Sequence, residues 1–215
     1  MHKIFDTQLY YCGGTIISEN YVLTVSSCVK VNHPEMMLVI AGVNFIANMT
    51  FAHEVEKVIA YPNDENHNPH RNNIALLKLK TPFEKVPTIN SISLPTKDVS
   101  FKVGDIGIVA GWGFTKPHEI VSDQRLHYTT VLISDQDECR TANKYNGRIY
   151  ETDFCAYNPD IPQGPCVGDG GDPLTINGKF VGFVSWSRDS CASTEYPTIY
   201  TRLSSYVDWI KENAV

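Results

Sequence analysis

Short apolar stretches rich in Val, Ile, Phe, Tyr and Thr recur along the chain and are separated by polar turn residues. Residues of these types favour strands, and the stretches are too short for helices of ordinary length. The clearest of them cover residues 21–25, 37–40, 74–79, 106–109 and 180–186. Clusters of Gly, Pro, Asn and Asp, as at residues 62–66 and 158–160, indicate turns and surface loops between them. The pattern predicts antiparallel β-sheets packed as a sandwich or as a pair of barrels.

The C-terminus is the one place where apolar residues follow a helical period. Val207 and Ile210 are three residues apart, and Ser204 or Ser205 can cap the segment. An acidic residue near its start and a basic residue near its end suit the helix dipole. We therefore predict one helix over residues 204–213, whose apolar side packs on the body of the protein and carries no chemistry.

Composition and charge exclude several classes of protein. The 215 residues suffice for one globular unit with a substantial core. Lys and Arg number 18 against 24 Asp and Glu, a net charge of −6, and the basic residues are scattered. We therefore expect no nucleic-acid partner. No apolar run approaches the roughly 18 to 20 residues that cross a bilayer, so we expect no membrane association either.

Six cysteines, an even number, occur without any Cys-x-x-Cys pair. The seven histidines do not fall at zinc-ligand intervals from them. Three disulfides, formed in an oxidising compartment, are the better interpretation, although residues 1–11 lack the apolar centre of a secretory signal. About 15 pairings are possible, and spacing alone does not choose among them. The sequon at Asn48 is a candidate N-glycosylation site that fits a secreted chain.

The most informative stretch is Cys166-Val167-Gly168-Asp169-Gly170-Gly171-Asp172-Pro173. A phosphate-binding loop would need a Lys and a Ser or Thr at its end, and this one has neither. The stretch instead resembles the nucleophile loop of trypsin-like serine proteases, Cys-x-Gly-Asp-Ser-Gly-Gly-Pro. Six further stretches along the chain, four before this loop and two after it, resemble motifs of that family and occur in the family's order. They are Cys12-Gly13-Gly14-Thr15, Leu23-Thr24-Val25-Ser26-Ser27-Cys28, Asn73-Ile74-Ala75-Leu76-Leu77, Gly111-Trp112-Gly113, Val184-Ser185-Trp186, and Tyr200-Thr201-Arg202 through Trp209-Ile210.

This resemblance implies an all-β fold of two antiparallel six-stranded β-barrels with a C-terminal α-helix. The whole chain, 1–215, would form a single peptidase-like domain, with one barrel in residues 1–90, the other in 91–203, and the helix in 204–213. It also implies a cysteine pairing, in which each disulfide flanks a functional loop of the family: Cys12 with Cys28, Cys139 with Cys155, and Cys166 with Cys191.

All three positions of the family's catalytic triad are substituted. The histidine base corresponds to Ser27, the orienting aspartate to Asn73, and the serine nucleophile to Gly170. Acyl transfer by this mechanism needs a hydroxyl, an imidazole to take and return its proton, and a carboxylate to hold the imidazole. Loss of the serine or the histidine alone costs such enzymes roughly a factor of 10⁶ in turnover. The resemblance therefore implies a protein that is not an enzyme.

Other functional positions of the family also differ. The oxyanion-hole N–H groups correspond to Gly168 and Gly170, which remain able to donate. The acidic base of the trypsin specificity pocket corresponds to Gly164, and two wall glycines correspond to Ser187 and Thr198, so we expect a narrowed pocket.

The activation machinery of the family differs as well. Active members bury a new amino terminus against the aspartate that corresponds to Asp169, and this chain carries no matching Ile-Val-Gly-Gly segment. Asp169 must then find another partner or stay hydrated. Asp172 stands where the family has a glycine.

Three sets of residues were considered as substitutes for the lost chemistry. Asp169 and Asp172 would need to face each other across a water to act as a catalytic pair. His67 and His70 lie in a polar loop before Asn73, where solvation is the simpler expectation. The hydroxyls of Ser26 and Ser27 have no evident base. The acidic residues Glu35, Glu54 and Glu56 do not reproduce a calcium loop, so we expect neither a metal nor a cofactor.

Three functions remain open. The first is a secreted pseudoprotease, a monomer that engages proteins of a host proteolytic cascade such as complement components. The second is a weak, unconventional hydrolase, and the third is a passive secreted antigen without a specific partner. Residues 101–105 and 109–113 resemble the trypsin-like allergens of mites and the inactivated protease paralogues of the scabies mite, which favours the first. We expect binding through loops 61–71 and 114–125 rather than through the narrowed cleft.

Overall fold

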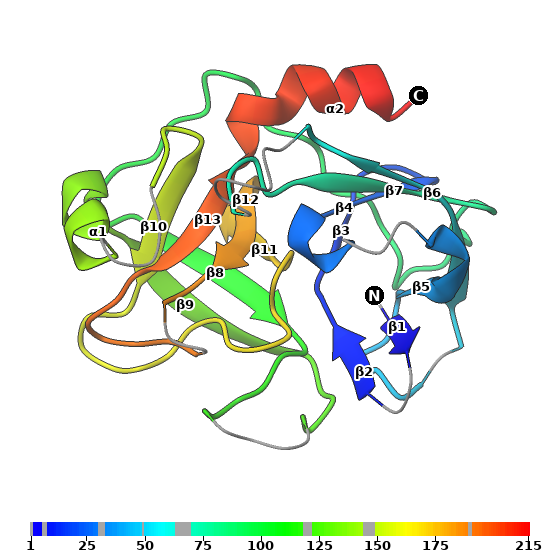
Figure 1. Ribbon diagram of the computed structural model, residues 1–215, viewed down its shortest axis with the longest axis horizontal. Coiled ribbons are helices and arrows are strands. Elements are labelled where there is room, and N and C mark those ends of the chain that lie inside the picture. Colours follow the sequence, from blue (N-terminus) through cyan, green and yellow to red (C-terminus); the bar gives the residue numbers. More distant parts are fainter. Residues whose placement is uncertain are drawn as a thin grey trace.

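The computed structural model describes residues 2–5, 8–29, 33–48, 50–62, 70–117, 122–143, 149–188 and 191–215. Its elements alternate strands with short turns, and α2 lies along the top of the view in Figure 1. The strands are β1 (His2–Phe5), β2 (Gln8–Tyr11), β3 (Thr15–Ile16), β4 (Tyr21–Thr24), β5 (Met37–Ile40), β6 (Ala52–Ala60), β7 (Ala75–Leu79), β8 (Ile106–Gly111), β9 (His127–Ile133), β10 (Asp153–Tyr157), β11 (Pro173–Ile176), β12 (Lys179–Trp186) and β13 (Thr198–Arg202). The helices are α1 (Gln136–Ala142) and α2 (Val207–Asn213).

The first half of the chain forms one sheet and the second half forms another. The first has seven strands in the order β2-β1-β5-β6-β7-β4-β3, and the second is a closed barrel in the order β10-β13-β12-β11-β8-β9. Paired strands are antiparallel throughout the described residues. The predicted all-β fold of two barrel-like sheets with a C-terminal helix is confirmed, with seven strands rather than six in the first sheet.

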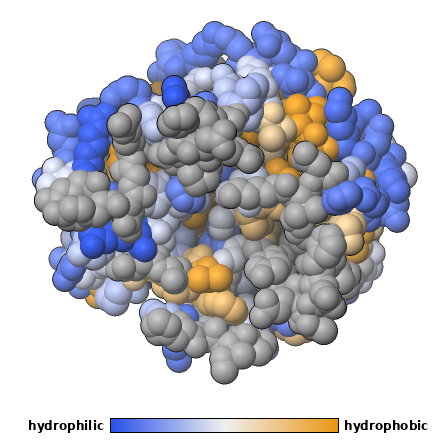
Figure 2. All heavy atoms as spheres, viewed as in Figure 1, coloured by the Kyte–Doolittle hydropathy of each residue, from blue (hydrophilic) through white to orange (hydrophobic). Residues whose placement is uncertain are grey.

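Apolar side chains of the strands form a core in each sheet and a third core between them. The first contains Val39 and Leu77, and the second contains Leu174 and Tyr200. The core between the sheets joins Leu23 and Leu76 of the first sheet to residues of β12 and of α2. Figure 2 shows that the described atoms on the face of Figure 1 are largely hydrophilic, with apolar atoms gathered in smaller areas. Burial of apolar surface thus accounts for the joining of the two halves.

The C-terminal helix packs as its sequence predicts but begins differently. Val207 and Ile210 are 2% and 0% exposed and face the core between the sheets. Ser204 and Ser205 lie in a 3-10 turn over Leu203–Tyr206, and no side chain caps α2. The predicted serine cap is therefore wrong, and the tight turn takes its place.

Helix α1 was not predicted from the sequence. Asp135 caps it, because its side chain accepts hydrogen bonds from the N–H groups of Asp137 (2.8 Å) and Glu138 (3.1 Å). The signal was an N-cap aspartate followed by two acidic residues and a later Arg140. It was missed because the segment has few apolar residues in helical spacing.

Three disulfides join Cys12 to Cys28, Cys139 to Cys155, and Cys166 to Cys191, the pairing that the family resemblance implies. No helix in the described part of the chain combines the length and the apolar character needed to cross a membrane.

A buried carboxyl group on β10 couples the fold to pH. Asp153 is 3% exposed, and one of its carboxylate oxygens accepts a hydrogen bond from the N–H of Tyr150 at 2.9 Å. Burial raises the pKa of Asp153 to about 7, against the lowering effects of that hydrogen bond and of the Arg202 charge. In the folded protein Asp153 therefore keeps a proton that the unfolded chain releases near pH 4.

This proton makes the free energy of unfolding depend on pH. Because the folded pKa is raised, the contribution of Asp153 is complete below about pH 4 and is lost as the pH rises through about 7. Each pH unit corresponds to about 1.4 kcal/mol, so the loss is at most about 4 kcal/mol. Asp153→Asn should remove this component in urea unfolding between pH 4 and 8, whereas the exposed Asp160→Asn should leave it unchanged. Equal profiles for wild type and Asp153→Asn would contradict the assignment.

Candidate functional site

The glycine-rich loop between β10 and β11 is fixed at the junction of the two sheets. The N–H of Gly13 donates to the carbonyl of Gly170 at 2.7 Å, and the N–H of Gly171 donates to that of Val184 at 2.8 Å. Gly171 has φ +92°, and a Cβ there would overlap the carbonyl oxygen of Gly13. Only glycine fits this position, because the conformation and the close approach both exclude a side chain.

Asn73 lies at the centre of a buried hydrogen-bond network that spans the junction. It is 1% exposed, and its Oδ1 accepts from Ser26 Oγ at 3.0 Å and from the N–H of Ser27 at 2.9 Å. Its Nδ2 donates to Ser185 Oγ at 3.0 Å, and its backbone carbonyl accepts from Thr201 Oγ1 at 3.1 Å. An amide suits these partners because it both donates and accepts.

The structure brings the three triad-like positions together around Cys28. Ser27 lies in the 3-10 turn Ser26–Cys28 and contacts Asn73, while the carbonyl of Gly170 lies 3.9 Å from Sγ of Cys28. A Cβ at Gly170 would lie 3.6 Å from Val25 and 3.7 Å from Cys28, which is ordinary contact. The position has room for a side chain, yet these residues supply neither an imidazole nor a nucleophile at Gly170.

Of the two loop histidines considered as substitutes, His67 lies outside the described residues. His70 stacks on Trp186 at the end of β12, with ring centroids 5.1 Å apart and an interplanar angle of 25°. Trp186 follows Ser185, a partner of Asn73. The structure thus places His70 beside the junction, with its ring packed on an aromatic surface.

The positions expected to form an oxyanion site and a specificity pocket differ in how deeply they are buried. Gly168 has φ +100°, a conformation that favours glycine. Thr198 begins β13 and is 2% exposed, while Ser187 is half-buried. Gly164 lines a different cavity, together with Cys166, Cys191 and Ala192. The narrowed pocket expected at Ser187 and Thr198 stays a prediction.

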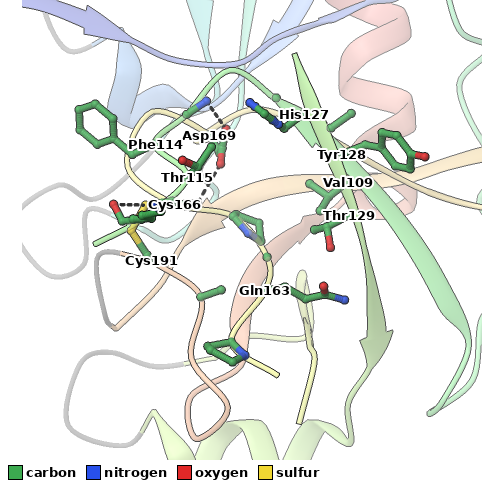
Figure 3. Close-up of a pocket in the computed structure, with 18 of the residues that line it drawn as sticks. Val109, Phe114, Thr115, His127, Tyr128, Thr129, Gln163, Cys166, Asp169 and Cys191 are labelled. Carbon is green, nitrogen blue, oxygen red and sulfur yellow. Dashed lines mark hydrogen bonds between the residues drawn. A yellow bond between two sulfur atoms is a disulfide. The ribbon is translucent and has the colours of Figure 1, made fainter. Parts of the chain in front are cut away.

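Asp169 lies at one side of that cavity, which has a volume of about 380 Å³ (Figure 3). One of its carboxylate oxygens accepts from the N–H of Gly113 at 2.7 Å, and the other accepts from the N–H of Cys166 at 2.8 Å. Figure 3 shows His127 on the same side of the cavity. Its imidazole pairs with Asp123 at 2.8 Å.

The structure also brings Asp169 and Asp172 together, as a catalytic pair would require. Asp172 is 1% exposed, however, and oxygens of both carboxyl groups lie beside Gly111, where the Asp172 carboxyl is closed to solvent. The arrangement suits a structural pair. Among the described residues, no group of three His, Cys, Asp or Glu side chains is placed to hold a metal ion.

The remaining candidate positions lie on the surface. Asn48 is exposed, and the N–H of Thr50 donates to its Oδ1 at 3.3 Å, while Met49 lies outside the described residues. The exposed Glu54 and Glu56 pair with Lys80 and Lys78, which makes them ordinary surface carboxylates. Glu35 pairs with His33.

Comparison with known proteins places the chain in a family. The model of the Trypsin family matches residues 1–210. Human kallikrein-11 is 28% identical over 97% of this chain and 73% of its own length. The beta-fibrinogenase mucrofibrase-3 of Protobothrops mucrosquamatus is 34% identical over 94% of this chain and 77% of its own length.

A solved structure agrees with these relatives. Neuropsin, a serine protease expressed in the limbic system of mouse brain, superposes with a TM-score of 0.86 at 28% identity, covering 100% of this chain and 93% of that one. The chain therefore belongs to the trypsin-like serine protease family. Kallikreins and snake venom proteases among its relatives are secreted proteins.

The network around Asn73 predicts a stability effect. Asn73→Ala would leave the buried groups of Ser27 and Ser185 without partners, at a cost of about 1–3 kcal/mol. We expect a lower urea midpoint for this variant and no change for Asn90→Ala, which removes an exposed amide. Equal effects of the two substitutions would show that the network contributes nothing to stability.

Proposed function

We propose that this protein is a secreted pseudoprotease, a member of the trypsin-like family that binds other proteins and does not hydrolyse peptide bonds. The observation that carries this proposal is the chemistry at the three triad-like positions. Gly170 has no hydroxyl, Ser27 has no imidazole, and the amide of Asn73 is engaged by neutral donors and acceptors. With no nucleophile to attack the peptide carbonyl and no base to take its proton, the mechanism of the family cannot begin.

The preserved framework supports a binding role. The three disulfides and the junction between the sheets remain, although the catalytic groups are gone. Random mutation without selection would have changed the disulfides and the junction as well as the catalytic positions. A protein that keeps the surface of a protease without its chemistry is suited to act as a competitor, scaffold or inhibitor among proteins of a proteolytic cascade.

The partner class follows from the resemblance to inactivated protease paralogues of the scabies mite. That resemblance, at residues 101–105 and 109–113, leads us to propose secretion into the gut or host skin and inhibition of host complement. The proposed partners are complement components, bound by a monomer.

One end of the barrel offers a contact surface for such a partner. Ile108 of β8 and Tyr128 of β9 are 47% and 78% exposed. With Arg125 and Leu126 they line a groove that adjoins loop 114–125. Apolar area beside a cation is typical of protein-binding surfaces. Loop 61–71, the other proposed contact, is described only at residues 61, 62, 70 and 71.

The first test concerns catalysis. Purified wild type should cleave no chromogenic peptide, and Gly170→Ser should fold with wild-type stability and remain inactive, because a hydroxyl there has room but no base. Turnover by wild type that Asp169→Asn or Asp172→Asn abolishes would overturn the proposal in favour of an unconventional hydrolase.

The second test concerns binding. The immobilised, disulfide-intact protein should bind purified complement components in surface plasmon resonance and reduce complement-mediated haemolysis. Arg125→Ala should weaken binding at least several-fold, since it removes the cation that lines the groove. Lys179→Ala removes another exposed positive charge and serves as the matched control. Failure of the wild type to bind or inhibit would favour a passive antigen.

A further inference from the structure

Asp172 is an unusual residue for its surroundings. It immediately precedes β11, its N–H donates to the carbonyl of Asp169 at 3.0 Å, and its own carbonyl accepts from the N–H of Val184 at 2.9 Å. The side chain is 1% exposed. Its Oδ2 has no N–H or hydroxyl donor among the described residues. A carboxylate in such a place would normally need a cation.

Three glycines from two segments make room for this carboxyl group and for that of Asp169. A Cβ at Gly13 would overlap Oδ1 of Asp172, and a Cβ at Gly113 would overlap Oδ1 of Asp169. A Cβ at Gly111 would overlap both Oδ2 of Asp172 and Oδ1 of Asp169. The two carboxyl groups therefore meet beside Gly111, in a space closed to side chains.

The donors around the pair are distributed unequally. Asp169 accepts hydrogen bonds from the N–H groups of Gly113 and Cys166, which favour its charged form. Burial and the charge of Asp169 raise the pKa of Asp172 well above its usual range. The pKa of Asp169 is also raised by burial, while its hydrogen bond with Asp172 and those from the two N–H groups oppose the rise.

Two other titratable groups of the described chain act on the pair. The charge of His127, on β9, favours ionised Asp169. The hydroxyl of Tyr200, on β13, is buried, and burial together with the two carboxyl groups raises the pKa of this phenol far above its usual value. The charge of the N-terminal ammonium lowers the pKa of Asp172, but its effect is smaller than those of burial and of the Asp169 charge. Two ionised carboxylates here would therefore repel each other.

We propose that Asp172 is protonated in the folded protein and donates its O–H to the carboxylate of Asp169, replacing the external cation that a buried aspartate otherwise requires. Asp169 is then held by three donors from within the chain: the N–H groups of Gly113 and Cys166 and the O–H of Asp172. The glycine-rich loop is consequently held by this shared proton, and it loosens when rising pH removes the proton. This inference stands independently of the proposed binding function.

The consequence is a pH-dependent stability with a definite sign. The folded state keeps one proton that the unfolded state releases near pH 4, so stability is complete below that pH and falls as the pH rises through the raised pKa of Asp172. Within this window one proton makes the unfolding equilibrium constant rise about tenfold per pH unit. Asp153 contributes a similar dependence, so the comparison is made in the Asp153→Asn background.

Two substitutions separate the proton from the hydrogen bond. Asp172→Asn keeps an N–H donor for Asp169 but cannot ionise, whereas Asp172→Gly removes the donor as well. In urea unfolding from pH 4 to 9, we expect Asp172→Asn to lose the tenfold-per-unit component and to be at least as stable as its parent at pH 8. Asp172→Gly should be less stable than Asp172→Asn at every pH. An unchanged pH dependence in Asp172→Asn would overturn the proposal.

The carboxyl titrations of the folded protein give an independent check. With ¹³C-labelled aspartate carboxyl groups in the Asp153→Asn background, NMR should show one carboxyl that stays protonated above the usual aspartate range and that disappears when Asp172→Asn is added. Carboxyl groups that all ionise near pH 4 would refute the proposal. Methylammonium at constant ionic strength should leave the wild-type midpoint unchanged. A concentration-dependent rise that Asp172→Asn lacks would instead show that the pair holds a cation.

Discussion

The two halves of this protein depend on buried hydrogen bonds that each half cannot satisfy alone. Gly13 of the first half donates to Gly170 of the second, and Asn73 connects Ser26 and Ser27 to Ser185 and to Thr201. An unpaired polar group at this depth would cost about 1–3 kcal/mol. The junction therefore constrains the loops around it, and their backbone course is retained whatever side chains they carry.

This constraint explains how the frame of the family persists with Ser27, Asn73 and Gly170 at the three triad-like positions. Asn73 has the size of an aspartate and forms its hydrogen bonds through an amide, and Gly170 leaves room for a side chain without a clash. The hydrogen bonds of the junction come from backbone groups, the Asn73 amide and the hydroxyls of Ser26, Ser185 and Thr201.

Two buried carboxyl groups of this protein are accommodated in the folded state by retaining a proton. Asp153 and Asp172 are both nearly inaccessible, and burial raises the pKa of each. The glycine-rich loop gains a particular benefit, since a carboxyl group at position 172 lies within reach of Asp169 only because Gly13, Gly111 and Gly113 carry no side chains. Stability therefore falls as the pH rises from about 4 through the raised pKa values of these two groups.

The sequence by itself determined the all-β class, five of the strands, the C-terminal helix and the family, because periodic apolar residues and ordered motifs are local properties. It also led to the prediction that Ser27, Asn73 and Gly170 occupy the triad positions of the family, which rests on residue identity and motif order alone. The sequence did not reveal helix α1, the seventh strand of the first sheet or the 3-10 turn before α2, where packing and capping outweigh periodicity. Only the tertiary structure decided that Asn73 is fully hydrogen-bonded and that Asp169 and Asp172 meet, because both depend on glycines and carbonyls brought together from distant segments of the chain.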